Sequence, residues 1–105
     1  MPSVDVSRLD ATVHGPVRLG VLTALNADGT LDFSTLKKRL VVTDGALGMH
    51  LQRLEDSGYV KCEKAFVGRR PRSSYRMTAA GRRALAGYLD AMLAIIVSVK
   101  KPRRR

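Results

Sequence analysis

Residues 43–59 constrain the fold more than any other part of this sequence. Their leucines, Leu47, Leu51 and Leu54, recur at spacings of four and three, which places them on one face of a helix. Thr43 suits the position before that helix, because its hydroxyl can accept a hydrogen bond from a free amide of the first turn. Gly58 suits a left-handed cap at the far end. The segment therefore predicts one amphipathic helix with a defined start and end.

The opposite face of this helix indicates a partner. Gly45, Met49, Gln52 and Arg53 point away from the leucines. Small residues near the N-terminal end, Gly45 and Gly48, allow close approach to the backbone. The N-terminal end of a recognition helix is also the part that reads the DNA major groove. On this segment alone, an ordinary amphipathic surface helix is the alternative.

The composition fits one small, strongly basic domain. The chain has 105 residues, is 45% hydrophobic and carries a net charge of +10. Half of that charge lies in residues 100–105, so the rest of the chain is basic as well. Such a charge favours a polyanionic partner, either nucleic acid or an anionic membrane.

Several kinds of site are not expected. The one cysteine, Cys62, excludes an internal disulfide and a cysteine-rich metal site. We expect it to be a small core residue, with a redox-sensing thiol as the alternative. His14 and His50 lack companion ligands at helical spacing, so we expect no metal or other cofactor. No catalytic set is present, so we expect no enzyme. No signal peptide or clear membrane span is seen, which favours a cytoplasmic protein.

The remaining pattern predicts the order of elements. A short amphipathic helix over Val6–Val13 precedes a helix that begins at Pro16, carries Arg18 on the same face as its leucines and ends in a turn at 26–29. The later expected elements are a very short strand at 30–33, a helix at 34–41 capped by Asp32 or Ser34, the helix at 44–57, a hairpin at 59–77 and a helix at 79–100 capped by Thr78.

The hairpin has a basic end. Residues 68–72 have turn chemistry and carry Arg69, Arg70 and Arg72. Two short helices joined by a tight turn and followed by such a hairpin make a winged helix-turn-helix. Helix 34–41 would lie across the phosphate backbone, helix 44–57 would enter the major groove, and the wing would reach phosphates or a neighbouring groove. A solvated turn with incidental arginines is the alternative.

These elements carry motifs in a recognisable order. They are His14-Gly15-Pro16-Val17-Arg18, Leu31-Asp32-Phe33, Thr43-Asp44-Gly45, His50-Leu51, Leu54-Glu55, Gly58-Tyr59-Val60, Phe66-Val67-Gly68-Arg69-Arg70-Pro71, Met77-Thr78 and Gly81-Arg82. From residue 9 to residue 90 the chain resembles small winged-helix transcriptional regulators of the MarR and ArsR types. The resemblance implies a dimeric DNA-binding regulator.

We therefore predict an α+β fold of the order α-α-β-α-α-β-β-α. Residues 1–100 form a single winged-helix domain and residues 101–105 a disordered basic tail. The DNA-contacting residues expected are Lys37, Lys38, Thr43, Gly45, Ala46, Met49, His50, Gln52, Arg53, Arg69, Arg70 and Arg72. His50 is either a phosphate contact or a packed edge. Ala46, Gly48 and Met49 cannot pair bidentately with a base, so phosphate and wing contacts should supply much of the affinity.

The last helix is too apolar to be left in water. Its a/d spacing predicts a homodimer, together with the first helix, through Val6, Leu9, Val13, Leu85, Tyr88, Leu89, Met92, Ile95, Ile96 and Val99. A short amphipathic membrane anchor is the alternative, and Asp90 argues against it.

The predicted function is that of a homodimeric, sequence-selective regulator of transcription that binds double-stranded DNA, with no membrane partner. A small-molecule effector of unknown identity is compatible with it. A winged-helix module for protein contacts, or for non-specific nucleic-acid binding, is the alternative.

Overall fold

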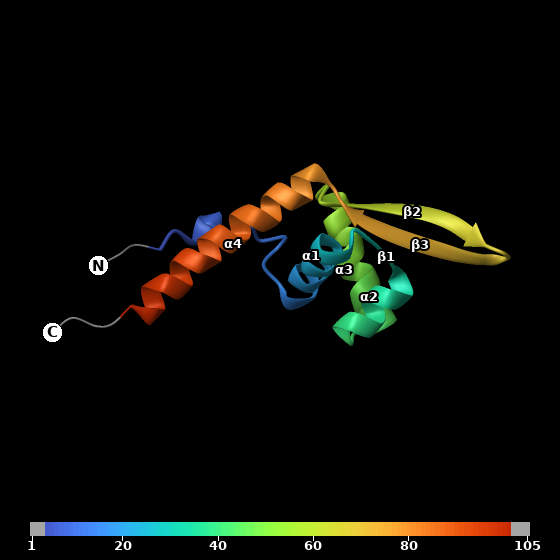
Figure 1. Cartoon of the computed structure of the whole chain (residues 1–105), viewed down its shortest axis with the longest axis horizontal. Helices are drawn as coiled ribbons and strands as arrows, with labels where there is room; N and C mark the ends of the chain where they lie inside the picture. Colours follow the sequence, from blue (N-terminus) through green and yellow to red (C-terminus); the bar gives the residue numbers. More distant parts are fainter. Residues whose placement is uncertain (1–3, 102–105) are drawn as a thin grey trace.

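The computed structural model describes residues 4–101. The elements in chain order are a 3₁₀ helix Val6–Arg8, α1 Pro16–Asp28, β1 Thr30–Asp32, α2 Phe33–Leu40, α3 Asp44–Asp56, β2 Val60–Val67, β3 Arg70–Met77 and α4 Ala79–Lys100. Helices α1 to α3 form a body from which the hairpin of β2 and β3 projects on one side and α4 on the other (Figure 1). The predicted α+β winged helix with a long C-terminal helix is confirmed.

The ends of the chain are described only in part. Most of the predicted basic tail falls on residues 102–105, which lie outside the described residues, as do residues 1–3. No helix within residues 4–101 is both long enough and apolar enough to cross a membrane.

Capping residues fix the starts of α2, α3 and α4. The side-chain oxygens of Asp32, Thr43 and Thr78 accept hydrogen bonds from the amide three residues on, at 2.8, 3.2 and 3.0 Å. These bonds satisfy amides that have no partner within the helix. Gly58 has a φ of 79°, which confirms the predicted left-handed cap after α3. Helix α1 runs through residues 26–28, which were predicted as turn, and ends at Gly29.

The wing is a regular hairpin with a shorter loop than predicted. The three strands are antiparallel in the order β1-β3-β2, and β2 pairs with β3 from Val60 opposite Met77 to Val67 opposite Arg70. Only Gly68 and Arg69 form the loop, because Gly68 adopts a φ of 65° that suits a two-residue connection. The prediction of a turn over 68–72 is therefore wrong, since Arg70 to Arg72 belong to β3.

The first predicted helix is also wrong. Only the 3₁₀ helix forms, and residues 10–14 fold into a turn. The carboxylate of Asp10 accepts hydrogen bonds from the amides of Thr12 and Val13 at 2.8 and 3.2 Å. A short acidic side chain that takes local amides in this way competes with helix formation.

One core joins helices α1 to α4 and the sheet. The leucines of α3 pack with residues from α1, α2, the sheet and α4, and the buried set is Val13, Val21, Leu22, Leu25, Leu36, Leu47, Leu51, Leu54, Val60, Tyr75, Met77, Leu85 and Tyr88. Three of these residues, Val13, Leu85 and Tyr88, were predicted to face a second subunit. They are instead covered within the chain, because the turn at 10–14 and the first half of α4 pack on the body.

Gly81 provides a test of how α4 is attached. A Cβ at this position would overlap the carbonyl oxygen of Tyr59 and lie 2.9 Å from the Cγ of Met77. We expect Gly81→Ala to lower the free energy of unfolding by about 1–3 kcal/mol, as overpacking does. The matched control is Gly87→Ala on the same helix, where a Cβ meets nothing within 4 Å. It should raise stability by up to about 1 kcal/mol. Urea unfolding followed by circular dichroism measures both, and equal effects would contradict this account.

Candidate nucleic-acid interface

Helix α3 has one buried and one open face, as the sequence predicted. Met49 is 63% exposed, and Gln52 and Arg53 are exposed beside it. At the N-terminal end of the helix, a Cβ built on Gly45 or Gly48 would meet nothing within 4 Å. A partner can therefore reach the backbone of the first two turns.

The turn between α2 and α3 borders this open end. Val41 has a φ of 53°, which a β-branched side chain rarely adopts, and it is 88% exposed. An open groove runs between the two helices and is lined by Phe33, Ser34, Lys37, Lys38, Val41, Val42, Thr43, Asp44 and Ala46. The structure thus brings the predicted contacts of α2 next to those at the start of α3.

Some of these side chains already have partners. Lys37 lies 2.9 Å from the carboxylate of Asp44, and Gln52 donates a hydrogen bond to Asp56 at 2.9 Å. Both pairs lie near the surface, where such contacts contribute little to stability. They can be exchanged for phosphate contacts at small cost.

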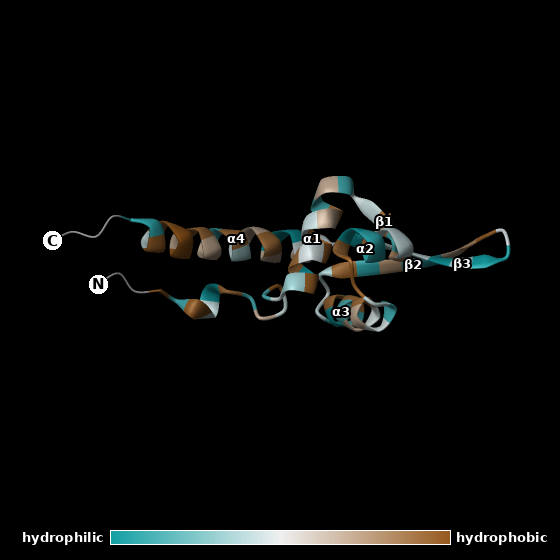
Figure 2. Ribbon diagram, turned by 90° about the horizontal axis from the view of Figure 1, so that it is seen from below, coloured by the Kyte–Doolittle hydropathy of each residue, from teal (hydrophilic) through white to brown (hydrophobic). Residues whose placement is uncertain are grey.

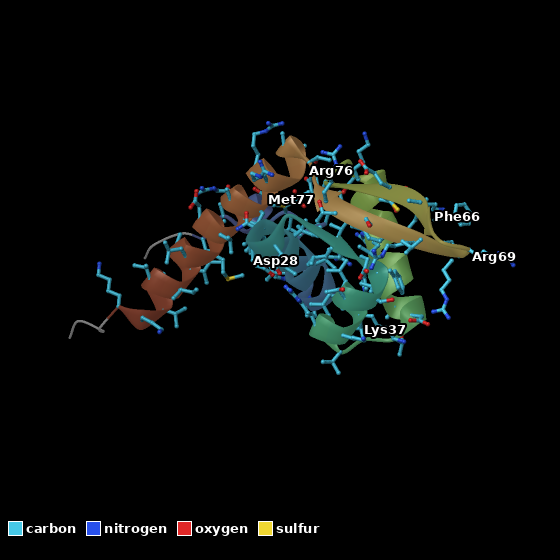
Figure 3. All side chains as sticks on the ribbon, turned by 45° about the vertical axis from the view of Figure 1, so that its right-hand side comes forward. Asp28, Lys37, Phe66, Arg69, Arg76 and Met77 are labelled. Carbon is cyan, nitrogen blue, oxygen red and sulfur yellow. The ribbon has the colours of Figure 1, made fainter. Side chains whose placement is uncertain are left out.

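The arginines of the wing fall into two groups. Arg69 and Arg70 are exposed at its end, and Figure 3 shows Arg69 far from Asp28 and the body. Arg72 is instead 2.9 Å from the carboxylate of Asp32, which also caps α2. A hydrogen bond from Thr35, with Arg72 as a smaller cause, holds the pKa of Asp32 below its usual value. Arg72 thus lies in β3 beside the start of α2, and its predicted contact with DNA stays a prediction.

The wing and α2 also share a depression. It is lined by Asp32, Phe33, Ser34, Thr35, Lys38, Val67, Arg70, Pro71, Arg72 and Ser73. Lys38 from α2 faces it together with Arg70 from the wing. This arrangement of cations on two elements suits a phosphate backbone that passes between them.

His50 turns inward rather than outward. A guanidinium nitrogen of Arg18 donates to Nδ1 of His50 at 3.0 Å, so this nitrogen is unprotonated. Burial, and then the positive charges of Arg18 and Arg53, lower the pKa of His50. Of the two expectations for this residue, the packed edge fits the structure.

Arg18 also donates hydrogen bonds to the backbone of the turn before α1. The side chain is 9% exposed and donates to the carbonyl oxygens of Ala11, Thr12 and His14. The sequence placed Arg18 on an apolar face but did not show this role. One feature of the sequence could have indicated it. Arg18 lies in the first turn of a helix that directly follows a turn, and the backbone carbonyls of a turn often lack hydrogen-bond donors.

Two further contacts tie the same turn to the rest of the fold. The hydroxyl of Tyr59 donates to Asp10, and His14 is hydrogen-bonded to the hydroxyl of Tyr88 at 2.9 Å. Burial raises the pKa of Asp10, but the hydrogen bonds from Tyr59 and from backbone amides outweigh it and leave the pKa lowered. These pairs join residues far apart in sequence, so no local pattern predicted them.

The remaining candidate sites are a metal site and the single cysteine. Within residues 4–101 no group of three or more histidine, cysteine or acidic residues could hold a metal ion. Cys62 is half-buried and lies opposite Tyr75 in the hairpin. Burial, with Cys62 as a further cause, raises the pKa of Tyr75 to about 12.

With this geometry established, comparison with known proteins identifies the family. Residues 17–96 match the family described as "Winged helix DNA-binding domain". This chain belongs to that family. The family is one of DNA-binding domains, which confirms the expectation that the chain is not an enzyme.

Individual relatives agree with this assignment. An uncharacterised protein of Methanocaldococcus jannaschii is 31% identical over 84 residues, which are 80% of this chain and 91% of that protein. The solved structure of a transcriptional regulator homologue from Pyrococcus horikoshii OT3 is 29% identical, with a TM-score of 0.81 over 90% of this chain and 95% of that one. A MarR-family regulator from Silicibacter pomeroyi shares the fold, with 23% identity and a TM-score of 0.67 over 94% of this chain and 66% of that one.

The contact between Arg18 and His50 predicts a pH dependence of stability. Because the pKa of His50 is lower in the folded chain, the unfolded chain binds the proton more readily. The free energy of unfolding should therefore fall as the pH drops from about 7 towards 5. His50→Gln keeps an oxygen that can accept from Arg18 and should flatten the dependence in this window. Urea unfolding at a series of pH values measures it, and equal slopes for the two proteins would contradict the prediction.

Proposed function

We propose that the chain is a homodimeric transcriptional regulator that binds double-stranded DNA with sequence selectivity. The observation that carries the proposal is the open N-terminal end of α3, bordered by the cations of α2 and of the wing. Helix α3 would enter the major groove, α2 would lie over the backbone, and Arg69 and Arg70 would contact phosphates or the minor groove beyond it.

The charge of the chain supports this role. Its net charge is +10, and the wing residues 60–77 include six basic side chains and one acidic side chain. The acidic residue, Glu63, lies 3.5 Å from Arg76, away from the end of the wing. The surface that would face DNA is therefore positive where phosphates would lie.

Helix α4 supports the proposed dimer. Its second half extends beyond the body and is apolar, as Figure 2 shows. The exposed apolar residues there are Leu89, Leu93, Ile96, Val97 and Val99, with exposures between 43% and 78%. The first four share one face of the helix. A second copy of α4 is the partner that would cover this stripe, and the two recognition helices could then meet successive major grooves about 34 Å apart.

This stripe differs from the one predicted. Val13, Leu85 and Tyr88 belong to the core of the chain. Ala94, Ile95 and Ser98 face the N-terminal segment around Val4 and Arg8. The proposed interface therefore keeps Leu89, Ile96 and Val99 and adds Leu93 and Val97, which the a/d pattern missed because it did not show which face the body covers.

Selection of bound duplexes from a random-sequence library tests the proposal as a whole. A selective regulator should enrich a common, roughly palindromic site. Binding without enrichment would instead support the non-specific alternative, and no binding at low salt would contradict a nucleic-acid role.

The wing arginines give a quantitative test. We expect the double variant Arg69→Ala, Arg70→Ala to bind DNA more weakly and to lower the salt slope by about 0.9 for each phosphate that it no longer neutralises. The charge-matched control is Arg82→Ala, Arg83→Ala, since both residues are exposed and the start of α4 lies far from the end of the wing and from the turn between α2 and α3. Fluorescence anisotropy over a salt series measures the slopes. The proposal for the wing is wrong if both double variants behave alike.

A charge within the exposed stripe tests the dimer. Leu93 is 57% exposed, so Leu93→Asp should leave the core intact while placing an unpaired carboxylate in the proposed contact. We expect monomers at micromolar concentration and weaker DNA binding. Thr23→Asp adds the same charge to the exposed side of α1 and should leave the oligomeric state unchanged. Sedimentation velocity distinguishes these outcomes, and a wild-type monomer would rule out the proposed dimer.

A further inference from the structure

The end of the wing is apolar as well as basic. Phe66 is 75% exposed and Val67 is 57% exposed, and both lie within two residues of the loop. Phe66 stands opposite Pro71 and Val67 opposite Arg70. Figure 3 shows Phe66 and Arg69 together at the end of the hairpin, far from Met77.

The position of Phe66 explains why nothing in the described part of this chain covers it. Alternate residues of a strand share a face, so Phe66 lies on the same face of β2 as the buried Val60. Near Val60 the body covers that face, but the hairpin then extends past the body. Phe66 and Val67 thus leave an apolar surface at the end of the wing that a partner outside the chain could cover.

The surrounding charge indicates the kind of partner. Residues 64–72 contain no acidic side chain and four basic ones, Lys64, Arg69, Arg70 and Arg72. Arg72 is paired with Asp32, whereas the other three form no ion pair within residues 4–101. The partner should therefore offer an apolar crevice between rows of negative charge. The minor groove of duplex DNA does so, because phosphates line its edges and stacked base pairs form its floor.

We propose that Phe66 enters the minor groove next to the site read by α3 and wedges partly between two base pairs. This inference rests on the DNA-binding function proposed above. Arg69 and Arg70 bind the phosphates along the edges of the groove, while Phe66 unstacks a base step and bends the duplex. Apolar wedges of this kind act on duplexes in other minor-groove proteins.

The wedge adds a source of selectivity to that of α3. At the start of α3, Gly45, Ala46 and Met49 make no bidentate contact with a base, so only Gln52 and Arg53, further along the helix, could make one. Pyrimidine–purine steps unstack more easily than other steps, so Phe66 favours sites with such a step under the wing. Sequence preference then arises partly from the deformability of DNA at the flank of the site.

Phe66→Ser and Phe66→Leu test the wedge on the duplex most enriched by the wild-type protein. The probe carries a dye at each end, so that energy transfer reports bending. Phe66→Ser should weaken binding about tenfold, as removal of a stacking side chain does. It should also reduce the bend and leave the salt slope unchanged, because the phosphate contacts are all kept. Phe66→Leu keeps an apolar wedge and should retain most of both effects, whereas Arg70→Ala should lower the salt slope.

Each other outcome overturns the inference. Equal affinity and equal bending by Phe66→Ser would show that no wedge forms, while binding by the wild-type protein would leave the proposed function standing. A fall in salt slope for Phe66→Ser would assign its effect to displaced arginines. Loss of binding to vesicles of phosphatidylglycerol and phosphatidylcholine, with DNA binding intact, would assign the patch to membranes. A shift to monomers in sedimentation would assign it to an interface between copies. Thermal unfolding checks that each variant is folded.

Discussion

A buried guanidinium holds the parts of this small fold together. Arg18 enters the core, and none of the carboxylates within residues 4–101 forms an ion pair with it. A charge in such a place is costly unless its donors are satisfied. Three carbonyl oxygens of the turn before α1 and a nitrogen of His50 supply the acceptors. The turn at residues 10–14, α1 and α3 are thereby fixed to one side chain. The same turn is held to Tyr59, just before β2, and to Tyr88 of α4. The angle between α3 and α4 thus depends on contacts that meet at this turn.

Local chemistry accounts for what the sequence predicted well. A hydroxyl or carboxylate before a helix, a leucine every three or four residues and a glycine after the last turn each act over a few residues. The bounds of α2, α3 and α4 could therefore be placed nearly to the residue, whereas α1 continues through residues 26–28. The hairpin followed from alternation on both sides of one glycine. The open face of α3 followed from the position of its leucines. None of these steps needed knowledge of a distant contact.

The features that the sequence did not predict depend on contacts between residues that are distant in sequence. The carboxylate of Asp10 replaces the expected first helix by a turn, and Asp32 forms an ion pair with Arg72 of the wing. His50 faces Arg18 across the core, a relation that no spacing within either helix reveals. On α4 the apolar pattern runs nearly all round the helix. Only the packing of the body and of the N-terminal segment shows that Leu93 and Val97, and not Leu85 and Tyr88, are left in water.

The junction at Gly81 makes α4 a lever arm. The amide of Thr78 donates to the carbonyl of Tyr59 at 3.0 Å, and its hydroxyl donates to the carbonyl of Gly58 at 2.6 Å, so the base of the wing, the C-terminal end of α3 and the start of α4 meet at one point. Gly81 lets the helix pass against the Tyr59 carbonyl without a Cβ between them. The helix that leaves this pivot has 22 residues and is therefore about 33 Å long. A rotation of about 5° at the pivot displaces the far end of such a helix by about 3 Å. Small changes in packing around Tyr59 are thus magnified along α4, and in a dimer held by the far end they would reset the distance between the two recognition helices.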